Sequence, residues 1–439
     1  MLSLVRPAAA VTALSLVAAF GAAGCATYNE RVSVPLGQFE SGDFAAAQAG
    51  FTNPKVVGSG FLRGAEGGMA AFVGGDWETA KDRFHAALDA VKDIEERAAI
   101  GVESVGEGLL SFALNEGQQS YDGEGYERVM AHACLGLAYL ALGQVDSVLV
   151  EARRVDQLLV AEEALYETEY GAGGLGHFLS ALAYELVGKP GEAYIDYQRM
   201  AEKGVGGDLT SRALVRLSSQ LGRKRDLARW IETYGPDLER PEGAASIVLV
   251  GGAGMGPAKR EIKIDIPLPD GVFSWAVPEA VAGDGGGELS LFFPATGQRL
   301  RASVIEDVSS VAAKNLSDRI LWLSAKSAIR GLLKRQLADQ LRDNKKGGAL
   351  LGLAADIFTI ATERADLRAW RTLPSNWQAA RAFVTPGEPV EVQVGVTGGA
   401  AVPLGTFQLT AGETMFVFAR SLRGRTYAHA VGGARVDAP

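Results

Sequence analysis

The chain has 439 residues, a formal net charge of −9 and a sequence pI of about 5.2. Hydrophobic residues make up 47% of it and charged residues 22%, which is typical of a protein with a packed core and excludes general disorder. The acidic balance argues against a nucleic-acid partner, because proteins that bind nucleic acids normally present a basic face to the phosphates.

The first 24 residues have the pattern of a secretory signal peptide. Arg6 is followed by an apolar run at 8–20, and small residues at 22–24 precede Cys25. The run is shorter than the roughly 20 residues that a membrane-spanning helix needs. Small residues before a cysteine resemble the lipobox of bacterial lipoproteins, in which the cysteine is acylated and the chain is cut just before it. A plain signal peptide with an incidental cysteine is the alternative.

The lipobox resemblance implies where the protein resides. Two or more acyl chains anchor a protein stably, since each buried methylene contributes about 0.8 kcal/mol. The residue after Cys25 is Ala26, whereas an Asp there usually retains Gram-negative lipoproteins at the inner membrane. In a two-membrane envelope the resemblance therefore implies an outer-membrane lipid anchor facing the periplasm. Residues 25–41 show no apolar periodicity, and we expect them to form a tether.

Residues 42–236 have a pattern typical of tetratricopeptide-like helical repeats, whose period is about 34 residues. Small or apolar residues at 68, 136, 181 and 215 occupy equivalent positions, separated by 68, 45 and 34 residues. The middle interval indicates an insertion around 161–174. Such helix pairs must stack to bury their apolar faces, and the resulting curved surface commonly holds a peptide or a partner helix. An irregular helical bundle is the alternative.

A stretch with two prolines and a glycine at 236–243 precedes a strand-rich domain at 244–439. Apolar and alternating runs predict strands at 245–250, 259–266, 289–293, 300–305, 389–394, 406–410 and 414–419. A basic amphipathic segment at 317–346 and an apolar run at 347–362 predict a helical hairpin packed on antiparallel strands. A membrane-surface helix is the alternative for this pair. The predicted fold class is thus α+β, with all-α repeats followed by an α+β domain.

The sequence shows no recognisable set of catalytic or metal-binding residues. The four histidines lack the spacing of zinc ligands. Residues 251–256 are glycine-rich but precede a predicted strand, where a phosphate-binding loop requires a helix. His132 and His177 occupy the same place in two successive repeats, which indicates packing. We therefore expect no cofactor, no metal and no enzymatic activity.

Several segments resemble an uncharacterised bacterial family of tetratricopeptide-containing lipoproteins. They are the loop at 121–127, the repeat at 135–153, and the run ERADLRAWRTLP at 363–374 with Arg381 shortly after it. The run around Trp370 is the distinctive part. The resemblance implies a role in the cell envelope and brings no catalytic residues with it.

The run around Trp370 has two interpretations. Charged residues beside a tryptophan indicate a helix end locked by ion pairs and an aromatic plug. Arginine, tyrosine and tryptophan are also common anchors of binding sites. The candidate partner-binding or structural residues are Tyr121, Tyr126, Arg368, Trp370 and Arg381.

These features together predict a membrane-anchored periplasmic scaffold or assembly factor whose helical repeats bind another envelope protein. Two alternatives follow from the same residues. One is an envelope enzyme or small-ligand binder with a site near Trp370. The other is a membrane-remodelling protein that uses the predicted helices at 317–362.

Overall fold

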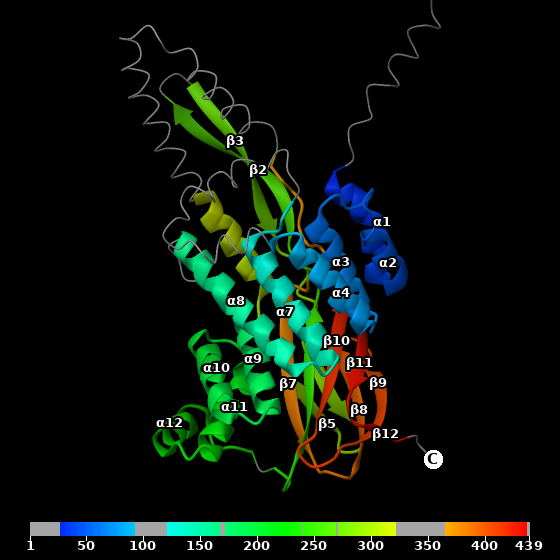
Figure 1. The fold of residues 1–439 in the computed structure, drawn as a ribbon, viewed down its shortest axis with the longest axis vertical. Coiled ribbons are helices and arrows are strands. Elements are labelled where there is room, and N and C mark those ends of the chain that lie inside the picture. Colours follow the sequence, from blue (N-terminus) through cyan, green and yellow to red (C-terminus); the bar gives the residue numbers. More distant parts are fainter. Residues whose placement is uncertain are drawn as a thin grey trace, which may run out of the picture.

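The computed structural model describes residues 27–92, 121–166, 172–238, 240–268, 271–321 and 365–436. The predicted signal peptide, Cys25 and most of the predicted hairpin at 317–362 lie outside these residues. Within them, the paired helices come first and a strand-rich part follows (Figure 1), so the α+β class and the order of its two parts are confirmed. No helix in the described ranges is both long and apolar enough to cross a membrane.

The helical part is a series of helix pairs joined by short turns. The pairs are α1 (Tyr28–Ser41) with α2 (Phe44–Phe51), α3 (Gly60–Val73) with α4 (Trp77–Asp89), α7 (Gly125–Ala141) with α8 (Val145–Tyr166), α9 (Gly174–Leu186) with α10 (Pro190–Glu202), and α11 (Gly207–Gln220) with α12 (Lys224–Tyr234). The four predicted repeat units fall on the last four of these pairs.

The five pairs in the described part of the chain share one kind of turn. A glycine with φ between 66° and 92° ends the first helix of each pair, at Gly42, Gly75, Gly143, Gly188 and Gly222. In each turn the glycine N–H donates to the carbonyl three residues back, and the next N–H donates to the carbonyl five residues back. This is the Schellman arrangement, which satisfies the last carbonyls of a helix and favours glycine in the left-handed region.

Helix α1 shows that the predicted tether at 25–41 is wrong for residues 28–41. Thr27 and Glu30 form a capping box, in which each side chain accepts a hydrogen bond from the other's backbone N–H. The helix then packs into the main hydrophobic core. Its buried side chains are Tyr28, Val32, Pro35 and Phe39. Their spacing of three to four residues is helical, but a proline in the middle of the segment obscures that period.

Apart from one hairpin, the strands in the described ranges form a sandwich of two five-stranded sheets. The first sheet has the order β11-β10-β1-β7-β6 and the second has the order β12-β9-β8-β4-β5. Their bounds are β1 (Ala245–Ala253), β4 (Leu289–Phe293), β5 (Gln298–Arg301), β6 (Ser303–Glu306), β7 (Asn376–Val384), β8 (Pro389–Val396), β9 (Val402–Gln408), β10 (Thr414–Leu422), β11 (Arg425–Val431) and β12 (Ala434–Val436).

Strand β1 lies at the centre of the first sheet and is buried along its whole length. It pairs with β7 in the antiparallel sense and with β10 in the parallel sense, which corrects the expectation of purely antiparallel strands. Ile247 and Leu249 face the second sheet, whereas Val248 and Val250 pack against the helices. The molecule therefore has three layers, with the first sheet between the helices and the second sheet.

The two parts of the chain share one core. Helical residues cluster with side chains of β1, β7 and β10, so the predicted domains at 42–236 and 244–439 do not have separate interiors. The predicted boundary between them does coincide with the change from α12 to β1. The predicted strand at 300–305 is in fact two strands, because Ala302 donates to the Leu289 carbonyl and the chain then leaves the second sheet for the first.

Strands β2 (Ala258–Leu268) and β3 (Gly271–Val281) form a separate long hairpin. Figure 1 shows this hairpin projecting beyond the helical layer at the end of the molecule where α1 begins. A further helix covers residues 308–321 and begins nine residues before the predicted start at 317. The remainder of the predicted helical hairpin, at 322–362, lies outside the described residues.

Candidate functional site

Three buried glutamates lie where helices α3 and α7 meet the segment 365–375, and we call them the carboxylate cluster. Glu66 comes from the middle of α3, and Glu124 and Glu127 come from the start of α7. Glu66 and Glu127 are 0% exposed. Because burying an unpaired carboxylate is very unfavourable, each of the three must have strong partners.

Glu127 brings together most of the residues that the sequence singled out. Its Oε2 accepts from the Tyr121 hydroxyl at 2.6 Å, and its Oε1 accepts from the Tyr126 hydroxyl at 3.3 Å and from the Trp370 N–H at 2.7 Å. The Arg368 guanidinium lies 5.1 Å from the centre of the Tyr121 ring. Four of the five candidate residues therefore form one contiguous group.

Glu66 binds the two residues that follow Trp370 in the chain. It accepts from the Arg371 N–H at 2.7 Å, from the Thr372 N–H at 2.9 Å and from the Tyr28 hydroxyl at 3.0 Å. Three consecutive amides, at 370–372, thus donate to two carboxylates from two different helices. This arrangement fixes the segment 365–375 against the helical layer.

Glu124 anchors two other elements. Its carboxylate pairs with Lys259 at the start of β2 and with Arg319 in the helix at 308–321. Burial alone raises the pKa of Glu124, but Arg319 and Lys259 outweigh burial and lower that pKa to about 2. For Glu66 and Glu127 burial is the dominant cause, and it raises the pKa of both carboxyl groups.

Trp370 is a plug in the core. It is 0% exposed, its ring lies edge-on to Phe61 with the centroids 6.3 Å apart, and its indole N–H donates to Thr372 Oγ1 at 3.0 Å. Arg368 forms a bidentate pair with Asp366. The aromatic plug and the ion pairs are therefore present, but the described residues 365–375 are irregular and lead into strand β7. With its polar atom bound and no exposed surface, Trp370 presents nothing to a ligand.

Arg381 belongs to a different cluster. It lies on β7, donates to Glu185 of α9 at 2.8 Å and shares that carboxylate with Arg216 of α11 and the Tyr197 hydroxyl. Burial raises the pKa of Glu185, but the two arginines outweigh it and lower that pKa to about 2. Arg381 is thus apart from the other four candidate residues, because the strand β7 carries it away from Trp370.

His132 and His177 make equivalent contacts in two helix pairs. The Nδ1 of His132 lies 2.6 Å from Glu151 on α8, and the Nδ1 of His177 lies 3.5 Å from Asp196 on α10. Both carboxylates are 19 residues after their histidine. The histidines are buried between paired helices, as predicted. In the described part of the chain, no cluster of histidine, cysteine and acidic residues is arranged to hold a metal ion.

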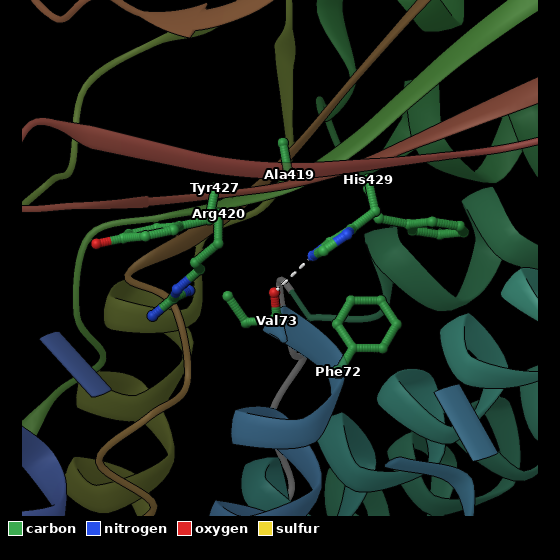
Figure 2. A pocket seen from close by; sticks show the side chains of 7 residues that line it. Phe72, Val73, Ala419, Arg420, Tyr427 and His429 are labelled. Atoms are coloured by element: carbon green, nitrogen blue, oxygen red, sulfur yellow. Dashed lines mark hydrogen bonds between the residues drawn. The ribbon is translucent and has the colours of Figure 1, made fainter. Parts of the chain in front are cut away.

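A small pocket lies between the end of α3 and the first sheet. Figure 2 shows the His429 imidazole directed at the Val73 carbonyl, to which its Nε2 donates at 3.0 Å, while the Arg420 guanidinium and the Tyr427 hydroxyl point to one side. The Arg420 guanidinium instead donates to the carbonyls of Thr372 and Leu373. The pocket has a volume of about 10 Å³. That volume suits about one water molecule and is far too small for a metabolite.

The glutamates at the centre of the cluster were not singled out from the sequence. Glu66 does carry a signal, because it is the only acidic residue in an α3 sequence otherwise made of small and apolar residues with one arginine. Charged residues at such positions are almost never buried unless they are paired. The amides at 370–372 that bind Glu66 and Glu127, however, lie 243 to 306 residues from these glutamates in the sequence, where no local pattern connects them.

No family model matches the sequence, and no curated protein matches it.

Proposed function

We propose that this protein is an envelope lipoprotein, acylated at Cys25, whose tetratricopeptide-like helical repeats bind another protein. In a Gram-negative cell it would face the periplasm from the outer membrane. The lipid anchor is supported by the sequence pattern at 1–25. The repeats are supported by the common Schellman turns and by the equivalent histidine–carboxylate pairs.

The observation that carries the proposal is an exposed apolar stripe on α12, the last helix of the series. Terminal helices of repeat arrays ordinarily present a polar outer face. On α12, however, no residue is buried, and two large apolar side chains face the solvent. Ile231 is 39% exposed and Tyr234 is 45% exposed. Leu238, just after the helix, is 59% exposed. Ile231 and Tyr234 lie three residues apart on one face of α12, and Leu238 is exposed just beyond the end of the helix. We treat these residues as one apolar stripe that a partner helix could cover.

The aromatic residues of this stripe are held in place. Trp230 stacks on Tyr234 with the centroids 5.5 Å apart and the planes at 14°. Its indole N–H donates to the Tyr194 hydroxyl of α10 at 2.9 Å, and the Arg229 guanidinium lies 4.0 Å from its ring centre. Rigid aromatic side chains next to an arginine are the residue types enriched at the energetic centres of protein interfaces.

The carboxylate cluster has a supporting role in this proposal. It connects α3, α7, β2, the helix at 308–321 and the segment 365–375 through buried, mutually bound groups. Such a network maintains one arrangement of the layers. The Glu185 pairs with Arg216 and Arg381 connect α9 and α11 to β7, and the bond from Trp230 to Tyr194 connects α12 to α10.

Photocrosslinking in the native envelope tests the proposal. A photoreactive residue at position 231 of the full-length, lipidated protein should give a discrete adduct with another protein, whereas the same residue at Val160, which is exposed on α8, should give none. The double substitution Ile231→Asp, Tyr234→Asp should abolish the adduct formed from a reactive residue at 227, whereas Val160→Asp should leave it unchanged. Equal adducts from positions 231 and 160, or an adduct that survives the double substitution, would contradict the proposal.

A further inference from the structure

The folded body begins almost directly after Cys25. Tyr28 is 6% exposed and its hydroxyl is bound by buried Glu66, and the Asn29 side chain accepts from Arg371 at 2.9 Å. The three residue steps from position 25 to position 28 span at most about 11 Å even when fully extended. An acyl group on Cys25 would therefore hold the start of α1 at the membrane surface.

The β2–β3 hairpin leaves the body at the same end. Tyr28 is bound to Glu66, which holds Thr372, and the neighbouring Trp370 N–H is bound to Glu127. Glu127 shares the Tyr121 hydroxyl with Lys259 of β2. The start of α1 and the base of the hairpin are thus attached to the same carboxylate cluster, and Figure 1 shows the hairpin extending outward from there.

The hairpin is long, and it is fixed to the body at its base, where Lys259 is 6% exposed and Val277 is 1% exposed. Each strand has 11 residues, which corresponds to about 35 Å at a rise of about 3.3 Å per residue. In the described ranges its two strands pair only with each other. A lone two-stranded hairpin is marginally stable in water, so contact with an additional surface would stabilise it.

The sequence of the hairpin is amphipathic in register. Isoleucines at 262, 264 and 266 alternate with charged residues at 261, 263 and 265. Their register partners are Val277, Trp275 and Phe273, so one set of positions is apolar on both strands. Aromatic and aliphatic residues next to charged ones are the composition found at the membrane–water interface.

We propose that the β2–β3 hairpin lies against the lipid surface to which Cys25 is anchored. This inference rests on the proposed acylation of Cys25. The occupant is lipid rather than another protein, because the anchor confines this end of the molecule to within about 11 Å of the bilayer. The hairpin projects from the same end and is about three times as long as this distance. It therefore reaches the bilayer before a partner protein can cover it.

Fluorescence from a single labelled position tests the inference. An environment-sensitive fluorophore is attached at Val272→Cys, next to the hairpin turn, and in a matched variant at Ala411→Cys. Position 411 precedes β10, which runs parallel to β1 from the far end of the molecule. Acylated Cys25 has no free thiol, and Cys134 is 1% exposed with its pKa raised by burial, so neither competes for the label.

The full-length acylated protein is reconstituted in vesicles of phosphatidylethanolamine and phosphatidylglycerol that carry a quencher on the acyl chains. The label at 272 should shift to the blue and be quenched several-fold more than the label at 411. Equal, water-like emission at the two positions would overturn the inference, as would a blue shift at 272 without quenching, which indicates cover by protein.

Mass spectrometry of the same sample separates the two proposals. An acylated Cys25 with a water-exposed label at 272 contradicts the hairpin inference alone. An unmodified Cys25 contradicts the proposed lipid anchor and, with it, the premise of the hairpin inference.

Discussion

Glu66 is a fully buried carboxylate whose direct partners are two backbone amides and one phenol. Replacement by alanine would leave all three donors without an acceptor. Each buried, unpaired donor costs about 1–3 kcal/mol, so Glu66→Ala should lower the free energy of unfolding by about 3 kcal/mol or more. Urea denaturation measures this change.

The matched control is Glu78→Ala, at an exposed position on α4. Its effect should stay within about 0.5 kcal/mol, as for most surface substitutions. Similar effects of the two substitutions would show that the carboxylate cluster does not hold the segment 365–375.

Glu306 on β6 is a buried carboxyl group with a pH-dependent contribution to stability. It accepts from the N–H groups of Gly173 and Leu175 at the start of α9. These two hydrogen bonds lower the pKa of Glu306, but burial outweighs them and raises it to about 7, from 4.5 in the unfolded chain. Between about pH 4.5 and about pH 7 the folded state therefore binds more protons than the unfolded chain. As a result, the free energy of unfolding falls as the pH rises from about 4.5 to about 7.

Glu306→Gln should remove this pH-dependent component. Relative to the parent protein, the variant should gain stability as the pH rises through that window, by an amount on the order of 3 kcal/mol for a shift of this size. Denaturant unfolding at a series of pH values gives the difference between the two proteins. A difference that does not depend on pH would show that the pKa of Glu306 is not raised.

The sequence indicated which residues belong to the candidate site, but not the contacts that each of them makes. The sequence named five candidates, and four of them lie together around Glu127, whereas Arg381 does not. These four are Tyr121, Tyr126, Arg368 and Trp370. That grouping came from a family resemblance and from residue type. The bond from the Trp370 N–H to Glu127 joins residues 243 positions apart, and neither periodicity nor spacing in the sequence contains this information.

At the scale of elements, the helix pairs were predictable because each pair leaves a local signal. A glycine at a fixed position marks the turn between the two helices of each pair, as Gly143 does between α7 and α8 and Gly188 does between α9 and α10. Helix α1 and strand β7 were not predicted. Pro35 obscures the period of α1, and the charged run before β7 is more typical of a helix end. In both cases tertiary contacts outweigh local preference.

The turn glycines give a prediction about these elements. Gly143 has φ of +71° and nothing near the position of a Cβ atom, so Gly143→Ala introduces backbone strain without a clash. It should destabilise the protein by about 1 kcal/mol. Gly191 is the second residue of α10, also with free space, and Gly191→Ala should stabilise the protein by about 0.5 kcal/mol. Urea unfolding that gives the same sign for both substitutions would contradict the assignment of Gly143 to a left-handed turn.

At the scale of the whole molecule, the shared core makes the helices and strands depend on each other. Phe418 of β10 is buried against Phe72 of α3 and Trp77 of α4. Truncation of a buried phenylalanine costs about 3–5 kcal/mol. Phe418→Ala should therefore accelerate amide hydrogen exchange in α3 as well as in β10. Unchanged protection of α3 would show that the helical and strand parts unfold independently.

The joining of the two parts was beyond prediction from a single sequence. The linker at 236–243 suggested two domains, and the change in secondary structure does occur there. The apolar side chains that unite the halves are nevertheless ordinary core residues in their own elements. Sequence pattern shows that such a residue is buried, but not what covers it.

The proposed location of the protein and the proposed orientation of its hairpin both depend on acylation at Cys25. Mass spectrometry of the protein isolated from its native envelope tests this most directly. The proposal predicts a mature chain that begins at Cys25 and carries acyl chains on that residue, with membrane association lost in Cys25→Ser. A mature chain with an uncleaved leader, or with an unmodified thiol at position 25, would contradict it.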